Sequence, residues 1–265
     1  MRWLGLIGLL VELSYAEALP IFDAHLHFNN DARNRLSVDQ VIGALDQAGI
    51  DKVLVSSTDD LGTQYLVEAA PDRFLPALRP YRGPGEIKTW MYDESVITYL
   101  AEQLGNRSYV ALGEFHAFEQ HMELSAVQGL IELARQYQLV LHIHGDQGAV
   151  SKLFSTWPEA RVIWAHAGFE DPDTVMASLD KFTNLWVDLS HRPDISTWAG
   201  LAPDWERMFI AYPERFLLGS DTHNLERWEN LRFYALDARD WLSVLPDSIA
   251  KKIAYENAET LFGIR

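Results

Sequence analysis

Short runs of apolar and β-branched residues recur along the chain at a nearly regular interval. Eight of them have the length and composition of strands: 19–24, 52–56, 74–79, 109–114, 139–144, 161–165, 185–189 and 215–219. The stretches between them carry helix signals. Apolar residues recur at helical spacing in 125–138, while Ser37 and Gln40 form a capping box for a helix that Gly49 ends. Strand and helix therefore alternate along the whole chain.

This alternation predicts an α/β fold with a parallel sheet, because the strands are too apolar to have one face in water. Eight repeats of the unit predict closure into a (β/α)8 TIM barrel. The length of 265 residues matches the roughly 250 that are typical of that fold. No linker or change in composition divides the chain, so we expect a single domain.

The charge of the chain narrows the choice of partners. Its formal net charge is -16 and its isoelectric point is about 4.9. Such a surface repels phosphate backbones and anionic lipid, so we expect a small-molecule substrate and no nucleic acid. The chain has no cysteine, so any metal site must use imidazole and oxygen ligands. The oligomeric state is not indicated.

The first 16 residues have the pattern of a secretory signal peptide. Arg2 precedes an apolar run at 4–11, and small residues lead to a cleavage position after Ala16. Cleavage would leave 17–265 as the barrel domain of a secreted or periplasmic protein. The alternative is a cytoplasmic protein in which a helix covers the barrel floor, since Glu12 interrupts the run. The run is shorter than the roughly 20 residues of a membrane span.

The histidines gather where a barrel has its active site. Eight of the nine lie at or soon after the carboxyl end of a predicted strand: His25, His27, His116, His142, His144, His166, His191 and His223. A single histidine of this kind is best explained by packing. Two imidazoles on one face of a strand, joined by others from further strands, instead predict a metal site at the C-terminal mouth.

Several segments, taken in order, carry a family resemblance. They are Asp23-x-His25-x-His27, "LHIHGD", "WAHAGF", "LLGSDTH" and "ENAETLFGI". The set resembles the amidohydrolase superfamily, and specifically its amidohydrolase-related branch, which also includes aminocarboxymuconate semialdehyde decarboxylase. The resemblance covers nearly all of the chain after Pro20.

The resemblance implies that His25, His27, one histidine of the fifth strand and Asp221 ligate a divalent cation. Both fifth-strand histidines face inward. His144 lies nearer the mouth and is the expected ligand, while His142 is a supporting or alternative one. Zinc is the first choice because nitrogen and carboxylate ligands with an open position suit catalytic zinc, and manganese and iron are the alternatives.

The resemblance also implies catalytic roles. Asp221 would accept the proton of the attacking water and pass it to the leaving group. His166 would stabilise the substrate oxygen or ligate a second ion. Glu114, in "ALGEFHAF", resembles the Gly-Glu of TatD-like members that bridges two ions, although the Gly-Leu-Asp continuation is missing. It would bridge two ions or orient a histidine. The fourth strand has no lysine that could be carbamylated.

Two arginines in "LRPYR", Arg79 and Arg82, are candidates for binding a substrate carboxylate through their planar guanidinium groups, or for pairing with surface acids.

The leading hypothesis is a metal-dependent hydrolase that acts on a small ester, lactone or amide. A metal-dependent decarboxylase of a small carboxylic acid, and a metal-binding barrel without turnover, are the alternatives.

Overall fold

A computed structural model describes residues 19–198 and 200–264. Its main sheet has eight strands in the order β1-β2-β3-β4-β5-β6-β7-β10, and every strand pair in it is parallel. The strands are Ile21–Leu26 (β1), Ile50–Val55 (β2), Phe74–Leu78 (β3), Ala111–His116 (β4), Val140–His144 (β5), Val162–Trp164 (β6), Leu185–Asp188 (β7) and Phe216–Leu217 (β10).

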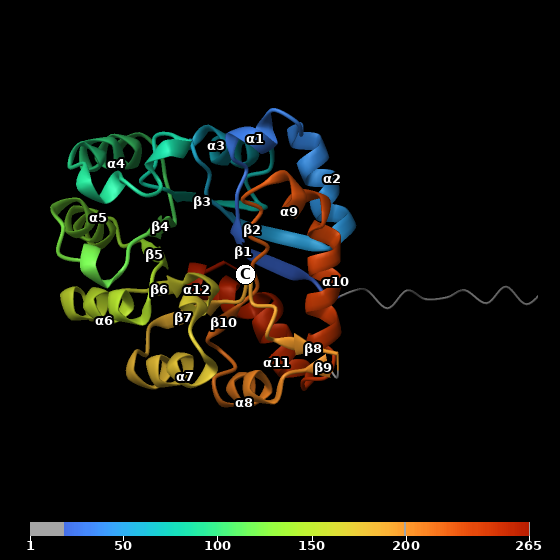
Figure 1. Ribbon diagram of the computed structural model, residues 1–265. Coiled ribbons are helices and arrows are strands. Elements are labelled where there is room, and N and C mark those ends of the chain that lie inside the picture. Colours follow the sequence, from blue (N-terminus) through green and yellow to red (C-terminus); the bar gives the residue numbers. More distant parts are fainter. Residues whose placement is uncertain (1–18, 199, 265) are drawn as a thin grey trace, which may run out of the picture.

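The first and last strands come together, which confirms the predicted barrel. The backbone N–H of Ala24 donates to the carbonyl oxygen of Leu218 at 2.8 Å. The eight strands thus form a nearly closed (β/α)8 barrel of one domain, with the helices outside it (Figure 1).

The helices alternate with the strands as predicted. The α-helices are Asn30–Arg33 (α1), Val38–Ala48 (α2), Leu61–Ala69 (α3), Ser95–Asn106 (α4), Ser125–Gln136 (α5), Gln147–Thr156 (α6), Pro172–Lys181 (α7), Pro203–Ala211 (α8), Leu225–Glu229 (α9), Leu231–Leu242 (α10), Asp247–Lys251 (α11) and Asn257–Phe262 (α12). Short 3-10 helices span Pro84–Glu86 (η1), Trp90–Tyr92 (η2), Glu119–His121 (η3) and Ala165–Phe169 (η4), and a π-helix spans Lys252–Glu256 (η5). The capping box of α2 is confirmed, because Ser37 and Gln40 exchange hydrogen bonds.

Between β7 and α8 the chain forms a small hairpin that is not part of the barrel. Its antiparallel strands are Ser196–Thr197 (β8) and Gly200–Leu201 (β9). In Figure 1 this hairpin lies close to the lower end of α10.

The lower half of the barrel is filled by apolar side chains. A buried cluster inside the strands contains Phe22, Ala24, Leu54, Leu75, Ala77, Ala111, Val140, Ile163 and Leu217. Ala258 and Leu261 of α12 belong to the same cluster, and the ring of Phe262 stacks on Phe22 at 5.9 Å between centroids. The last helix therefore covers the amino-terminal end of the barrel.

The predicted signal segment lies outside the described residues, so it stays a prediction. Within 19–198 and 200–264, no helix has both the length and the apolar character needed to cross a membrane.

Candidate active site at the barrel mouth

A bulge in β1 turns the two histidines of the first strand into the barrel. Between Asp23 and Leu26, β1 contains one residue more than the part of β2 that it pairs with. The extra residue shifts the alternation, so that His25 and His27 follow the interior face instead of the outer one. Asp23 stabilises the bulge, since its Oδ1 accepts the backbone N–H groups of His25 and Ser220, both at 3.0 Å.

A second bulge, in β4, directs the side chain of Glu114 to the same part of the barrel interior as His25 and His27. Between Gly113 and Phe115, β4 again has one residue more than its partner strand. Gly113 has a φ of 128°, and a Cβ at this position would lie 2.1 Å from the carbonyl oxygen of His142. Only glycine fits here. Without the extra residue, the Glu114 side chain would not reach the interior face.

The hydrogen bonds of His25 and His27 fix which ring nitrogens carry protons. His25 Nδ1 donates to Asp188 Oδ2 at 2.8 Å, and His27 Nδ1 donates to the carbonyl oxygen of Ser56 at 2.6 Å. With Nδ1 protonated on each neutral ring, both Nε2 atoms present lone pairs. These two Nε2 atoms are only 3.1 Å apart.

Two carboxylate oxygens complete this group. Glu114 Oε2 lies 3.5 Å from His25 Nε2 and 3.3 Å from His27 Nε2. Asp221 Oδ1 lies 3.6 Å and 3.2 Å from the same two atoms. We call these four atoms the acceptor cage. Within the described residues, Asp221 Oδ1 is buried and has no hydrogen-bond partner.

The size of the acceptor cage fits a metal ion. A tetrahedral zinc ion with ligands at 2.0–2.1 Å places those ligands about 3.3 Å from one another. Five of the six separations among these atoms run from 3.1 to 3.6 Å, the sixth being that between Glu114 Oε2 and Asp221 Oδ1. Four buried acceptor atoms at this spacing repel one another unless a cation or protons lie between them.

The electrostatics of the cage favour a positive charge inside it. Burial alone would lower the pKa of His25, but the carboxylates of Asp221, Glu114 and Asp188 raise it well above its usual value. Burial alone would likewise raise the pKa values of Glu114 and Asp221, yet the surrounding imidazoles hold both well below their usual range. Both carboxyl groups are thus ionised at neutral pH.

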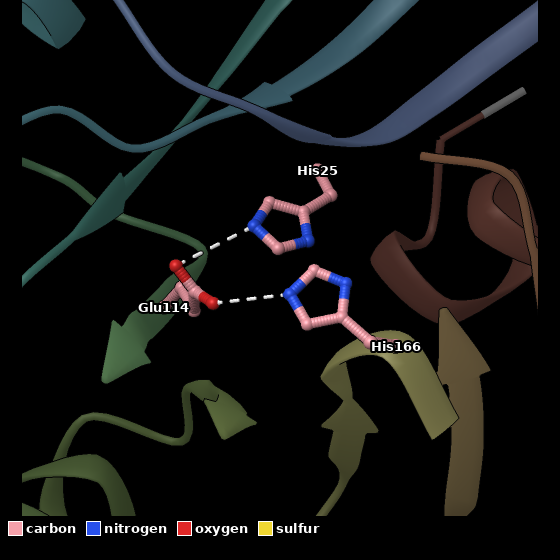
Figure 2. Close-up of side chains that lie close together, drawn as sticks. All are labelled: His25, Glu114 and His166. Carbon is pink, nitrogen blue, oxygen red and sulfur yellow. Dashed lines mark ion pairs between the residues drawn. The ribbon is translucent and has the colours of Figure 1, made fainter. Parts of the chain in front are cut away.

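Glu114 also faces a second set of imidazoles. Its other oxygen, Oε1, lies 2.8 Å from His144 Nδ1 and 3.6 Å from His166 Nε2. Figure 2 shows the two oxygens of Glu114 directed at different rings, one toward His25 and one toward His166. His144 therefore lies on the far side of Glu114 from the acceptor cage.

His166 is held by the segment that follows β7. Its Nδ1 lies 2.9 Å from Ser190 Oγ and 3.1 Å from the Ser190 carbonyl oxygen. Ser190 Oγ donates its own proton to Asp188 Oδ2 at 2.6 Å, so both atoms near Nδ1 are acceptors. Nδ1 must then carry the proton, and His166 Nε2 presents a lone pair. Phe169 stacks on the His166 ring at 4.9 Å between centroids.

His142 lies below the acceptor cage. Its ring is 4.5 Å from that of His25 between centroids, and it is buried. Burial and the nearby His25 hold its pKa well below the usual value, so the ring is neutral. Its Nε2 has no hydrogen-bond partner in the described part of the chain. With His25 and Asp188 it forms a further group of close ligand atoms.

The two predicted substrate arginines lie in different places. Arg79 is buried and donates from Nε to the carbonyl oxygen of Glu114 and from Nη2 to Glu114 Oε2, both at 3.0 Å. Arg82 lies at the surface, where it pairs with Glu86 and Asp93. The structure brings Arg79 to the site but not Arg82.

Three histidines of the mouth were not assigned a role from the sequence. His191 Nε2 lies 3.0 Å and His223 Nδ1 3.4 Å from Asp221 Oδ2. His116 is a third such residue: its ring stacks on His144, and burial lowers its pKa to about 3. The only sequence feature that marked these three residues was their place at or after the end of a strand. That feature does not indicate what their side chains contact.

These side chains surround a cavity of about 380 Å3 at the mouth. Its lining residues are His27, Asn29, Arg79, Ile87, Glu114, His116, His144, His166, Phe169, His191, Asp221 and His223. The cavity gives a small molecule direct access to the acceptor cage, since His27, Glu114 and Asp221 belong to both.

Comparisons with known proteins find a matching family model and several solved structures with a similar fold. Residues 92–264 match the family model described as Amidohydrolase. Among curated proteins the sequence has no match. A probable 2-pyrone-4,6-dicarboxylic acid hydrolase from Acinetobacter baumannii, solved with citric acid bound, has 15% identity and a TM-score of 0.60, over 92% of this chain and 99% of that one.

Two further solved structures are similar over almost their whole length. An amidohydrolase from Burkholderia multivorans with bound zinc has 14% identity and a TM-score of 0.60, over 93% of this chain and all of that one. Amidohydrolase 2 from Bifidobacterium longum subsp. infantis has 16% identity and a TM-score of 0.59, over 93% and 100% of the two chains.

Proposed function

The chain belongs to the amidohydrolase family, and from this premise we propose that it is a metal-dependent hydrolase that cleaves a small ester, lactone or amide with activated water. The observation that carries the proposal is the acceptor cage. Two imidazole nitrogens lie 3.1 Å apart, and each lies 3.2–3.6 Å from one carboxylate oxygen of Glu114 and one of Asp221, in a buried position at the base of a cavity.

We assign His25, His27, Glu114 and Asp221 as the residues that would hold the cation. Zinc is the proposed ion, because the donor set consists of nitrogen and carboxylate oxygen and because the similar Burkholderia multivorans protein was solved with zinc. When bound, a divalent cation lowers the pKa of a water molecule toward neutrality and polarises a carbonyl group.

Asp221 is placed to move the proton of the reaction. Its Oδ1 belongs to the acceptor cage, while its Oδ2 faces the cavity beside His191 and His223. Its pKa is held well below the usual value, so the group is an ionised carboxylate at neutral pH and has a lone pair for the proton. The same oxygen can then return that proton to the leaving group.

His166 supplies a second polar group to the substrate. Since its Nδ1 donates to Ser190, the lone pair of its Nε2 faces the cavity. A His166 ring that also carries a proton on Nε2 would donate a hydrogen bond to the substrate oxygen on which negative charge develops, and would keep that proton while Asp221 delivers its own to the leaving group.

Arg79 has two roles in this proposal. Two of its guanidinium nitrogens hold Glu114 in place. Its third nitrogen is Nη1, and the Arg79 side chain lines the cavity. We assign Nη1 to a carboxylate or carbonyl oxygen of the substrate.

The proposal has two versions, which differ in the number of metal ions that the site binds. One ion in the acceptor cage leaves His166 free for the substrate. A second ion would use Glu114 Oε1 together with His144 and His166, and the lone pair of His166 Nε2 supports that arrangement.

The test combines elemental analysis with reconstitution. We expect purified protein to contain one equivalent of zinc, and removal of the metal to abolish hydrolysis across a panel of esters, lactones and amides. Restored zinc should restore the rate. Full activity after complete metal removal would contradict the proposal. Release of carbon dioxide from a carboxylated substrate, with no hydrolysis, would replace it with the decarboxylase alternative.

A further inference from the structure

A second cavity opens beside the mouth, between the loop after β7 and helix α10. It has a volume of about 470 Å3, within the range of small-molecule pockets. We call it the side groove. Its apolar walls come from Leu189, Pro193, Ile195, Phe233, Tyr234 and Trp241.

The side groove adjoins the catalytic cavity. Phe169 and His191 line both of them. His191 contacts Asp221 Oδ2 at 3.0 Å, so the groove begins next to the proposed proton acceptor. Phe169 stacks on His166 and remains 58% exposed, which leaves one part of its ring for a ligand.

The polar groups of the groove are already engaged inside the protein. Arg192 donates from Nη1 to the carbonyl oxygens of His166 and Glu170. Arg227 donates from Nε to the carbonyl oxygens of Ser220 and Asp221. Arg192 is also paired with Asp194, which compensates its charge, whereas Arg227 keeps its positive charge at the end of the groove next to Asp221.

Away from Arg227, the groove offers apolar surface and one negative charge. Phe233 lines it and is 65% exposed, an unusual state for a phenylalanine in contact with a cavity. Asp237, one helical turn further along α10, also lines it, and no ion-pair partner of this carboxylate is found in 19–198 or 200–264. An anionic group at this end would be repelled.

From these observations we infer that the side groove binds an uncharged apolar tail of the molecule that is hydrolysed at the mouth. The inference rests on the proposed function and specifies its substrate class. The substrate has a carbonyl group at the acceptor cage and a neutral alkyl or aryl tail that passes His191 and lies against Phe233.

Tail length is the property that tests this. Each methylene group that leaves water for an apolar wall should strengthen binding by about fourfold. Calorimetric titration of the zinc-loaded full chain with butanamide, hexanamide and octanamide should therefore show affinity that rises steeply with length. This readout does not depend on turnover.

The variant Phe233→Ala removes one exposed wall without opening the core. It should weaken octanamide binding by about five- to tenfold and leave butanamide binding unchanged. Leu236→Ala is the matched control, since Leu236 lies on the same helix, is 53% exposed and does not line the groove. This control should behave as the wild type does with all three amides.

The carboxylate of Asp237, at the far end of the side groove, allows a second experiment. The monoamide of octanedioic acid should bind less tightly than octanamide, and Asp237→Asn should reduce that difference. Affinity that is independent of tail length, or equal responses of Phe233→Ala and Leu236→Ala, would overturn the inference even if hydrolysis is found. Length-dependent binding without hydrolysis of any panel substrate would support the groove and reject the proposed function.

Discussion

The floor of the barrel and its mouth are built from the same eight strands, but they follow different rules. On the floor, the strands pack apolar side chains such as Phe22 and Val140 against α12, although β2 has one residue more than β1 between Ile21 and Phe22. At the mouth, β1 and β4 each carry a bulge, and His191 and Asp221 have positive φ values of 55° and 45°. Packing of apolar side chains determines the floor. At the mouth, bulges and unusual backbone conformations direct polar atoms toward one point.

The carboxylates show the same contrast. Imidazoles around Glu114, Asp188 and Asp221 keep the pKa values of these groups below the usual range. Where imidazoles contribute little, burial dominates: it raises the pKa values of Asp23 and Asp60 to about 6, and at Asp23 it does so although His25 lowers the pKa. The same degree of burial thus has opposite consequences in the two regions, and each region can be changed separately.

The largest expected effect is on catalysis, from Asp221→Asn at the mouth. We expect kcat for the best panel ester to fall by at least about 10³-fold, because the amide cannot accept the proton and its binding of the cation is weaker. The apolar core is untouched, so circular dichroism should show a folded protein. A decrease of less than tenfold would show that Asp221 is not the proton acceptor.

The next effect is on stability, from Phe22→Ala on the floor. Removal of this buried ring should lower the free energy of unfolding by about 3–5 kcal/mol in urea titrations. The kcat of the folded protein should stay within about threefold of the wild type. Phe233→Ala, a change of the same type at an exposed position, serves as control and should cost less than about 0.5 kcal/mol. Equal losses for both variants would contradict the assignment of the floor as the core.

A smaller effect should follow from Asp188→Asn, which lies between floor and mouth. The variant keeps a hydrogen-bond acceptor for His25 Nδ1 but loses the charge, so zinc affinity should fall by about 10- to 100-fold in a competition titration with a chelator. Asp173→Asn, at an exposed position on α7, is the control and should leave the affinity unchanged. An unchanged affinity in Asp188→Asn would mean that the tautomer of His25 is fixed by other contacts.

The smallest effect concerns pH and a carboxylate away from the mouth. Burial raises the pKa of Asp60 from 3.8 to about 6, although Tyr109 and Gln64 donate hydrogen bonds to it. The folded state therefore holds this proton more tightly than the unfolded state, and the resulting stability is complete below about pH 4 and lost as the pH rises through 6.

Asp60→Asn should consequently be more stable than the wild type by about 1 kcal/mol at pH 8, with no gain at pH 4. Urea titrations at the two pH values measure this difference. A gain that is the same at both pH values would show that the proton on Asp60 is not its cause.

The sequence predicted the floor well because packing follows local periodicity. Apolar runs and capping signals located all eight barrel strands; β1 is shifted by two residues from the expected 19–24, and β10 is three residues shorter than the expected 215–219. Period-two alternation also predicted that His25 and His27 face the same way. It did not predict the bulge below them, because the contact that stabilises it joins Asp23 to Ser220, which lies 197 residues further along the chain.

The arrangement of the ligand candidates was beyond local reasoning for a similar reason. The sequence left open whether Glu114 touches the cation, and only the second bulge determines that its Oε2 faces His25 and His27. The positions of His191 and His223 depend on loop conformations that no residue pattern specifies. Residue types were readable from the sequence, whereas their directions were set by long-range contacts.

The two bulges have a consequence for protein engineering. Each one adds a residue above the apolar layers, so the direction of the ligands is decided after the strands have left the floor. The apolar layers of the floor can therefore be redesigned, or exchanged with those of another eight-stranded barrel. The mouth, with its candidate ligands, would be transferred as one unit. Gly113 would have to be transferred with that unit, because a Cβ at this position would clash with the carbonyl oxygen of His142.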